Sequence, residues 1–254
     1  MKLILDLETN GFLDKKDLVI HCIVCKDIET GEVYSYNPNT INDALELLNK
    51  AEVLIGHNIT GFDIRVLKQV LNYEFKGKAF DTLLCSRLIW TNRLELDYKF
   101  KQMPPKLYGR HSLESWGYRL GLRKGDYQEH STFDEYNQDM LEYCQRDVEV
   151  TDLLFKEIIR SNYSEDAITL EHKFAYWIQK QEEQGIDFDE RSAETLHSIL
   201  TKKRLEISDK LSLVFSEWKK STGFKTYKRD NIKRGIKAGV PVEQFKTEIF
   251  NPNS

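Results

Sequence analysis

A chain of 254 residues, 40% of them hydrophobic and 31% charged, is long enough to bury a core and has the composition of a soluble globular protein. No apolar run reaches membrane-spanning length, and a strand pattern follows Met1 and Lys2 directly, so we expect no membrane anchor, no signal peptide and a cytoplasmic location. The net charge is −4, but it is unevenly distributed along the chain: residues 202–246 contain thirteen Lys/Arg and five Asp/Glu, a net charge of +8. This basic segment forms either a solvated surface or a surface that faces a polyanion.

Strand patterns open the chain and helical patterns dominate its second half. Apolar runs bounded by turn residues predict strands at residues 2–8, 18–27, 31–37 and 52–58, the first three of them antiparallel. Apolar residues at helical spacing predict helices at residues 40–51, 62–72, 82–90, 111–121 and 133–160, then two long helices at 165–184 and 190–218. Residues 96–110 are expected to form a basic loop, and residues 221–254 show weak periodicity. This order predicts a mixed α/β fold with appended helices.

The four cysteines, Cys22, Cys25, Cys85 and Cys144, are expected to be buried structural thiols. Cys22 and Cys25 have the C-x-x-C spacing, but they lie within a predicted strand, where residues three apart face opposite sides of the sheet. Their sulfurs could not easily share a metal ion or a disulfide, so neither a redox nor a zinc function is expected.

Two carboxylates end the first predicted strand. Asp6 and Glu8 are separated by one residue, so they project from the same face of the strand and repel each other. The pair is either an ordinary exposed strand end or a site for a divalent cation that lies between the two groups.

Two further acidic signals follow. Asp63 opens a predicted helix just after a buried strand and a glycine-containing loop, where it could also serve only as a helix cap. Tyr143 and Asp147 are four residues apart on a predicted helix and therefore share a face. Tyr143 could instead be a core aromatic residue whose hydroxyl is bound to a neighbour.

Taken in order, these motifs resemble the DEDD superfamily of 3′–5′ exonucleases, in the variant with tyrosine in its third motif. Asp6, Glu8, Asp63 and Asp147 match the four acidic positions, and Tyr143 matches the tyrosine. The stretches FDTLLCSRLIW, RHSLESWGYRLG and EYCQRDVEVT are similar to the proofreading domain of family-A DNA polymerases, above all those of short-tailed, T7-type bacteriophages. The similarity runs from Met1 to about Trp218 and resumes weakly at VEQFKTEIFNPNS.

The resemblance implies a ribonuclease-H-like mixed sheet flanked by helices, with a C-terminal helical extension. It places the exonuclease domain at residues 1–163 and the start of the polymerase thumb region at residues 164–254. It further implies two divalent cations, Mg²⁺ or Mn²⁺, held by the four carboxylates, because hard cations prefer oxygen ligands and neutralise repulsion between the acids and an anionic phosphodiester. Asp6 would bridge both ions, Glu8 and Asp147 would complete the first site, and Asp63 would support the second. Tyr143 would orient the attacking water.

The expected substrate is the single-stranded 3′ end of DNA. Phe12 matches a position where the family places an apolar wedge against the terminal base, although it could equally be a core residue. Asn58 could donate hydrogen bonds to the terminal nucleotide or only hold its own loop, and the Asn58–Asp63 spacing is one residue longer than in bacterial members. His111 could touch phosphate, although a capping or exposed surface role is favoured over it.

The palm and finger motifs of family-A polymerases are missing from this sequence, so the polypeptide by itself is not expected to polymerise DNA. The chain is then an excised domain or the exonuclease part of a split polymerase, with a separate polymerase subunit as partner; the Met start suits both, and the ending FNPNS favours a truncation or split. Two alternatives stay open: an RNA 3′–5′ exonuclease of the same superfamily, and a non-catalytic replication scaffold.

Overall fold

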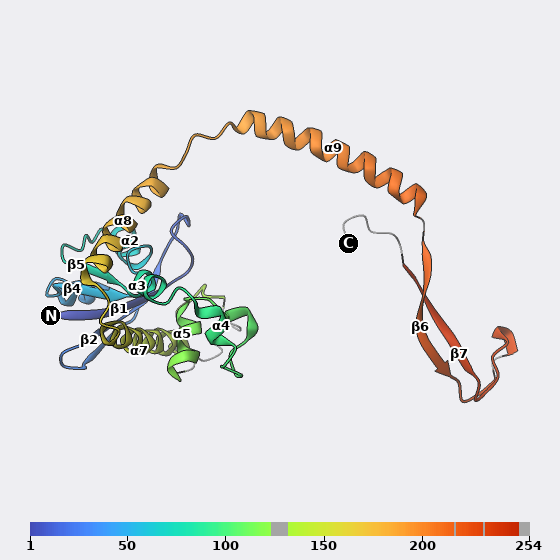
Figure 1. Ribbon diagram of the computed structural model, residues 1–254, viewed down its shortest axis with the longest axis horizontal. Helices are drawn as coiled ribbons and strands as arrows, with labels where there is room; N and C mark the ends of the chain where they lie inside the picture. The colour runs from blue at the N-terminus through green and yellow to red at the C-terminus, as the bar shows by residue number, and fades with distance from the viewer. Residues whose placement is uncertain (123–131, 216, 231, 249–254) are drawn as a thin grey trace. The chain divides into compact units, whose positions relative to one another are not determined.

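The structure, a computed structural model, describes residues 1–122, 132–215, 217–230 and 232–248 (Figure 1). The chain divides into two compact units, Met1–Gly185 and Ile186–Ser254. Each unit is described by itself. None of the helices in the described residues is both long enough and apolar enough to cross a membrane.

The first unit contains a five-stranded sheet and the helices around it. Its strands are β1 (Lys2–Thr9), β2 (Ile20–Asp27), β3 (Val33–Tyr36), β4 (Val53–Gly56) and β5 (Lys78–Asp81). Its helices are α1 (Ala44–Leu48), α2 (Asp63–Leu71), α3 (Thr82–Ile89), α4 (Arg93–Asp97), α5 (Leu113–Leu120), α7 (Gln138–Arg160) and α8 (Glu165–Gln184), with short 3-10 helices at Ile41–Asp43 and Pro105–Leu107. The region expected to be a basic loop therefore contains the end of α4 and a 3-10 helix.

The strands follow the order β3-β2-β1-β4-β5. β2 is antiparallel to both β1 and β3, whereas β4 is parallel to both β1 and β5. The expected mixed sheet is confirmed. β1 lies at its centre, and its alternating side chains supply the core on both faces.

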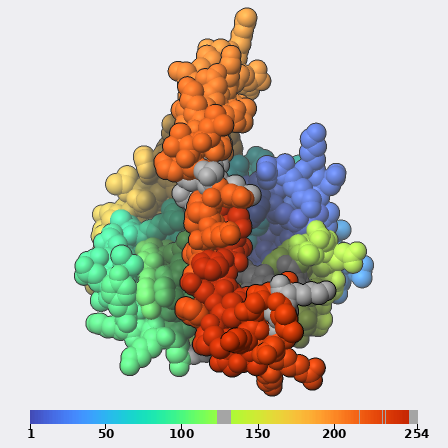
Figure 2. Space-filling model, turned by 90° about the vertical axis from the view of Figure 1, so that its right-hand side faces the viewer, coloured from blue at the N-terminus to red at the C-terminus, as the bar shows by residue number. Residues whose placement is uncertain are grey.

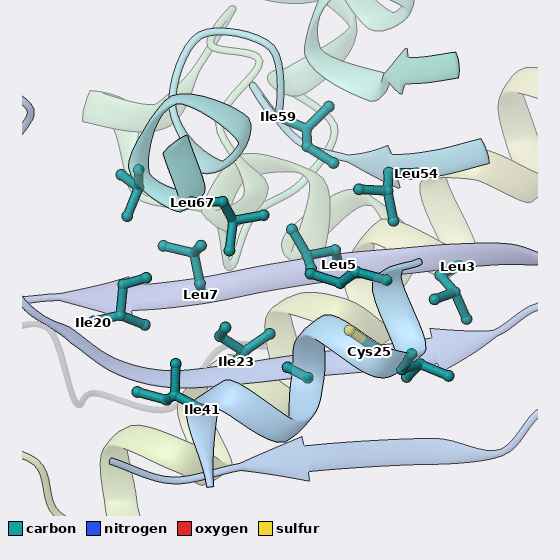
Figure 3. Packing of buried hydrophobic residues seen from close by; sticks show 14 of the residues in the cluster. Leu3, Leu5, Leu7, Ile20, Ile23, Cys25, Ile41, Leu54, Ile59 and Leu67 are labelled. Carbon is teal, nitrogen blue, oxygen red and sulfur yellow. The ribbon is translucent and has the colours of Figure 1, made fainter. Parts of the chain in front are cut away.

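One face of the sheet is covered by α1 and α2. Leu3, Leu5 and Leu7 of β1 point to this face, where Figure 3 shows them packed with residues such as Ile41 and Leu67. On the opposite face, Ile4, Cys22 and Val24 pack against α7 through Met140, Cys144 and Val148. Because the even-numbered residues of β1 face α7, the strand directs Asp6 and Glu8 toward that helix.

Two of the cysteine predictions are confirmed, namely that the four thiols are buried and that Cys22 and Cys25 face opposite sides of the sheet. All four thiols are buried and unbridged. Cys25 belongs to the core under α1 and α2, whereas Cys22 belongs to the core under α7, so the C-x-x-C pair points to opposite faces of the sheet.

Helix α8 belongs to the first unit, although the expected boundary lay before it, between residues 163 and 164. The backbone N–H of Asp81 donates a 2.8 Å hydrogen bond to Nε2 of His172, and the His172 ring lies 5.6 Å from the ring of Phe80. These contacts fasten α8 to the end of β5. The division of the chain into compact units therefore follows α8 rather than preceding it.

The second unit is not helical throughout, which corrects the expected helical extension. Helix α9 (Glu190–Val214) ends before the expected Trp218. It is followed by an antiparallel hairpin of β6 (Trp218–Thr226) and β7 (Pro241–Glu248), with a 3-10 helix at Ile232–Arg234 between the strands. Aromatic and β-branched residues such as Phe224, Val242 and Phe245 favour strands in this segment. Residues 249–254 lie outside the described residues.

Candidate active site

The end of β1 supplies the first two carboxylates of the site. β1 pairs with β4 through Lys2, Leu3 and Ile4 only, while its pairing with β2 continues to Thr9. Asp6 and Glu8 therefore lie where β1 has passed the last residue paired with β4, and both are half-buried. The sequence prediction that they share one face is confirmed by their position on a regular strand.

Asp63 reaches the same strand from the start of α2. It is 4% exposed, and its carboxylate accepts a backbone hydrogen bond from Leu7, between Asp6 and Glu8. Burial raises the pKa of Asp63 well above its usual range, and the neighbouring charge of Asp6 raises it further. A positive charge among these acids would favour the ionised form of Asp63 and so counteract both effects.

Helix α7 brings Tyr143 and Asp147 to the site from the other side of β1. Both side chains are buried, with 5% exposure each, and they lie one helical turn apart. Burial raises the pKa of Tyr143 above its usual value, and the charges of Asp147, Glu8 and Asp6 raise it further in that order. The phenol is therefore within electrostatic reach of three of the four carboxylates.

Cys144 is a site neighbour that the sequence analysis treated only as a structural thiol. Its Sγ donates to the backbone O of Asp6 at 3.4 Å and to Asp6 Oδ2 at 3.3 Å. Potential ligand atoms of Asp6, Glu8 and Cys144 all lie within 4.8 Å of one another. The sequence contained one signal for this placement, because Cys144 directly follows Tyr143 on the helix that carries both Tyr143 and Asp147.

The donor set fits hard divalent cations. Asp6, Glu8, Asp63 and Asp147 offer carboxylate oxygens, which Mg²⁺ and Mn²⁺ prefer, and two of them are almost fully buried. Burial is also the main cause that raises the pKa of the Cys144 thiol, so this group stays protonated and acts as a hydrogen-bond donor to Asp6. Cation charge offsets the repulsion that otherwise raises the pKa of Asp63.

Phe12 is not a core residue, which removes one of its two expected roles. Its side chain is 77% exposed, and the ring makes an edge contact with Phe62, 6.4 Å between centroids. Phe62 immediately precedes Asp63, so the contact between the two rings places the exposed Phe12 ring next to the start of α2.

Asn58 lies in the loop between β4 and α2 and adopts a left-handed backbone conformation, with φ of 66°. Its side chain lies over Gly61, where an added Cβ would stand 2.4 Å from Asn58 Oδ1. Its backbone N–H donates to Asp81 Oδ1 at 3.0 Å, and Thr60 Oγ1 donates to Asp81 Oδ2 at 2.8 Å. Asp81, which also caps α3, organises this loop and was missed by the sequence analysis.

His111 is neither an exposed residue nor the cap of α5, because Ser112 accepts the capping hydrogen bond. Its Nδ1 lies 3.1 Å from Ser86 Oγ. Burial, assisted by Arg119 and Arg87, lowers the pKa of His111 to about 4, so the ring is neutral near pH 7 and is not a cation for phosphate.

Known proteins resemble this chain in sequence. Residues 3–159 match the family model of the RNase_H superfamily. The chain is 30% identical over 269 residues to the DNA-directed DNA polymerase of Enterobacteria phage T3, and 30% identical over 266 residues to that of Escherichia phage T7. These alignments cover 87% and 86% of this chain but 38% of each polymerase, so the chain spans well under half the length of these relatives. The expected similarity to T7-type phage polymerases is confirmed.

Among solved structures, the chain is similar to Escherichia coli RNase D, described as an exoribonuclease involved in structured RNA processing. The TM-score is 0.40 and the identity 13%, over 69% of this chain and 40% of that one. A similarity with so low a TM-score and identity gives no information about the substrate.

Proposed function

Because the chain belongs to the RNase_H superfamily, we propose that it is a metal-dependent 3′–5′ exonuclease that removes nucleotides from the 3′ end of DNA. The proposed product is the nucleoside 5′-monophosphate, and the proposed biological role is proofreading. Its 30% identity to two phage DNA polymerases favours DNA as the substrate.

One observation carries the proposal. Asp63 binds the backbone of Leu7, and Tyr143 on α7 lies among the charges of Asp147, Glu8 and Asp6. These influences support the proposal that acids from three distant parts of the chain gather in one region, where burial and mutual repulsion would make them costly without cations. Such an arrangement is expected where hard cations hold an anionic substrate.

The proposed roles follow from position and chemistry. Two bound Mg²⁺ or Mn²⁺ ions would activate a water and stabilise the leaving 3′ oxygen. Asp6 would contact both ions, Glu8 and Asp147 the first, and Asp63 the second. Tyr143 keeps its proton because its pKa is raised above the usual value, so it serves as a hydrogen-bond donor that orients water rather than as a base.

Substrate contacts are proposed for two exposed residues near the start of α2. Phe12 would stack on or wedge against the terminal base, as exposed aromatic side chains do in single-strand sites. Asn58, held by the loop that Asp81 organises, would donate its amide to the terminal nucleotide. A frayed or mismatched 3′ end would enter this site more readily than a paired one.

A digestion experiment tests the proposal. The purified chain is incubated with a 3′-mismatched primer–template, with Mg²⁺ or with EDTA, and the products are separated by length. We expect stepwise shortening from the 3′ end and mononucleotide release only with the metal. Asp6→Ala should abolish cleavage while Asp43→Ala, an exposed acid outside the site, should leave it unchanged. Wild-type protein without activity, or an active Asp6→Ala variant, would contradict the assignment.

Matched DNA and RNA single strands distinguish the two substrate classes. Faster loss of RNA would replace the DNA assignment with an RNA 3′–5′ exonuclease. A folded wild-type protein that binds DNA but cleaves neither substrate would identify a non-catalytic scaffold.

A polymerase part is the proposed partner, whether it lies on the same or a separate polypeptide. The sequence given contains none of the palm and finger motifs expected of family-A polymerases. We therefore expect no incorporation of nucleotides by this chain under conditions in which it degrades a primer.

A further inference from the structure

The hairpin β6–β7 gathers lysines on one of its faces. Lys220 lies directly opposite Lys246 in the strand register, and residues paired in this way share a face. The register shifts between Ser221 and Gly223, which inserts one extra residue into β6. Because of this bulge, Lys225 returns to the face of Lys220 although the two residues are an odd number of positions apart.

The two faces of the hairpin differ in charge. The face of Lys220, Lys225 and Lys246, called here the lysine face, carries one carboxylate, Glu248, whose Oε1 lies 3.6 Å from Lys220 Nζ. Its net charge is +2. The opposite face carries one lysine, Lys219, and one carboxylate, Glu243, so its net charge is zero. Phe224 and Phe245 are exposed on it.

The lysine face is poorly explained by the hairpin alone. Lys220 and Lys246 are like charges in directly opposed positions, which destabilises a strand pair. All three lysines are exposed, and an isolated two-stranded hairpin is only marginally stable. In Figure 2 the hairpin is the red-orange to red part of the chain, and the lighter orange is α9.

We propose that the lysine face binds the phosphate backbone of single-stranded DNA. Ammonium groups along a two-stranded ribbon contact successive phosphates, and counterion release makes such contacts favourable. The inference rests on the proposed exonuclease function and adds a second DNA contact to it. It also explains the basic segment 202–246 in an otherwise acidic chain.

Lysines can also protect the edges of a hairpin against pairing with another chain. That explanation predicts self-association when the lysines are removed, with unchanged affinity for DNA. The binding proposal predicts loss of affinity with an unchanged oligomeric state, so the two can be separated by measuring both quantities.

The test measures binding of the full chain to a long single-stranded DNA in EDTA, where cleavage is absent, at several salt concentrations. The triple variant Lys220→Gln, Lys225→Gln and Lys246→Gln should weaken binding at least tenfold at low salt. It should also reduce the slope of log affinity against log salt by about 2, since each single-strand phosphate contact contributes about 0.7.

Two neighbouring lysines provide a matched control. Lys219→Gln and Lys220→Gln each remove one exposed positive charge from adjacent positions of β6, but from opposite faces. We expect Lys220→Gln to weaken DNA binding clearly more than Lys219→Gln. Equal effects would overturn the lysine face as the binding surface, and this single-site comparison stands if the triple variant fails to fold.

Cleavage separates this inference from the proposed function. With Mg²⁺, the triple variant should digest a trinucleotide, which has too few phosphates to occupy the lysine face as well as the active site, at the wild-type rate. It should digest the long strand with a raised KM. A wild-type protein that cleaves, together with a triple variant that binds and cleaves the long strand normally, overturns the inference alone. A wild-type protein that cleaves nothing overturns the proposed function, whereas the DNA affinities of the lysine variants still decide the inference.

Discussion

Asp63 has an environment unlike that of an ordinary surface acid. Its carboxylate is almost fully buried, accepts a hydrogen bond from the backbone of Leu7 and lies in the field of Asp6. Without a cation, the charged form is disfavoured by both burial and repulsion. The residue therefore couples the stability of the protein to metal binding and to pH.

The sign of the pH effect follows from the raised pKa. Between the unfolded and folded pKa values of Asp63, the folded protein holds the extra proton, so stability falls as pH rises through this interval. In EDTA, we expect the wild type to lose stability relative to an Asp63→Asn variant as pH rises from about 4 toward neutrality; His111, whose lowered pKa acts in the opposite sense, is common to both proteins. Adding Mg²⁺ at neutral pH should raise the wild-type melting temperature, because the ion binds the folded state.

Asp63→Asn tests this coupling. The amide keeps an acceptor for the Leu7 N–H but removes the charge, so in EDTA at neutral pH the free energy of unfolding should rise by on the order of 1 kcal/mol. Nuclease activity and most of the stabilisation by Mg²⁺ should be lost. Urea unfolding with and without Mg²⁺ measures both effects, and a variant less stable than wild type in EDTA would argue against the charge repulsion.

Tyr143→Phe separates hydrogen bonding from packing. The ring packs edge-on to Phe133 at 6.2 Å, and the substitution retains that ring. We expect stability within about 0.5 kcal/mol of wild type and a kcat at least tenfold lower. Because the raised pKa keeps the hydroxyl protonated, the pH–rate profiles of the two proteins should have the same shape. An alkaline limb that disappears in the variant would instead assign a titrating role to Tyr143.

At the scale of elements, β1 and α7 form the frame of the site. β1 is the central strand, and α7 packs on the face to which Asp6 and Glu8 point. A second helical layer, α4 and α5, is fixed by a buried ion pair between Asp97 and Arg119, with 2.6 Å between Oδ2 and Nη2.

That ion pair gives a prediction on stability. Asp97 is fully buried, accepts a bidentate contact from Arg119 and also accepts the N–H of Gly109. Asp97→Ala would leave the Arg119 charge buried without its carboxylate, so the free energy of unfolding should fall by about 3–5 kcal/mol. Glu157→Ala, which removes an exposed pair with Arg160, serves as the control and should cost less than about 1 kcal/mol. Comparable losses in denaturant unfolding would contradict the buried pair's importance.

At the scale of the whole molecule, the chain consists of two compact units that carry different parts of the proposed function. The first unit, Met1–Gly185, holds all five predicted catalytic residues together with Phe12 and Asn58. The second, Ile186–Ser254, holds the basic hairpin. Chemistry and affinity for long DNA are therefore expected to be separable.

A truncation after Gly185 tests this division. The first unit contains the whole five-stranded sheet and its three core clusters, so it should fold cooperatively and digest a trinucleotide at a rate close to that of the full chain. It should bind long single-stranded DNA more weakly. A truncation after Ile159, which deletes α8 and its contacts with β5, should by contrast be less stable by differential scanning calorimetry.

Much of the fold and the site could be predicted because the relevant signals are local. The alternation of side chains along β1 determines which leucines enter the core and places Asp6 and Glu8 on a common face. The four-residue spacing of Tyr143 and Asp147 likewise places both on one face of a helix. The order of these motifs was enough to indicate the superfamily.

Other features depend on contacts between distant segments, which local patterns do not encode. Only the tertiary structure brings Cys144 to Asp6, ties the loop of Asn58 to Asp81, exposes Phe12 and fastens α8 to β5 through His172. The sequence analysis did not predict the hairpin, because β6 pairs with β7 across the segment between them and the register of that pairing is not encoded by a local pattern. The sequence by itself thus determined which residues could act together, because the periods of strands and helices are local. Packing decided the environment of these residues, because burial and neighbouring charge arise only when the chain is folded.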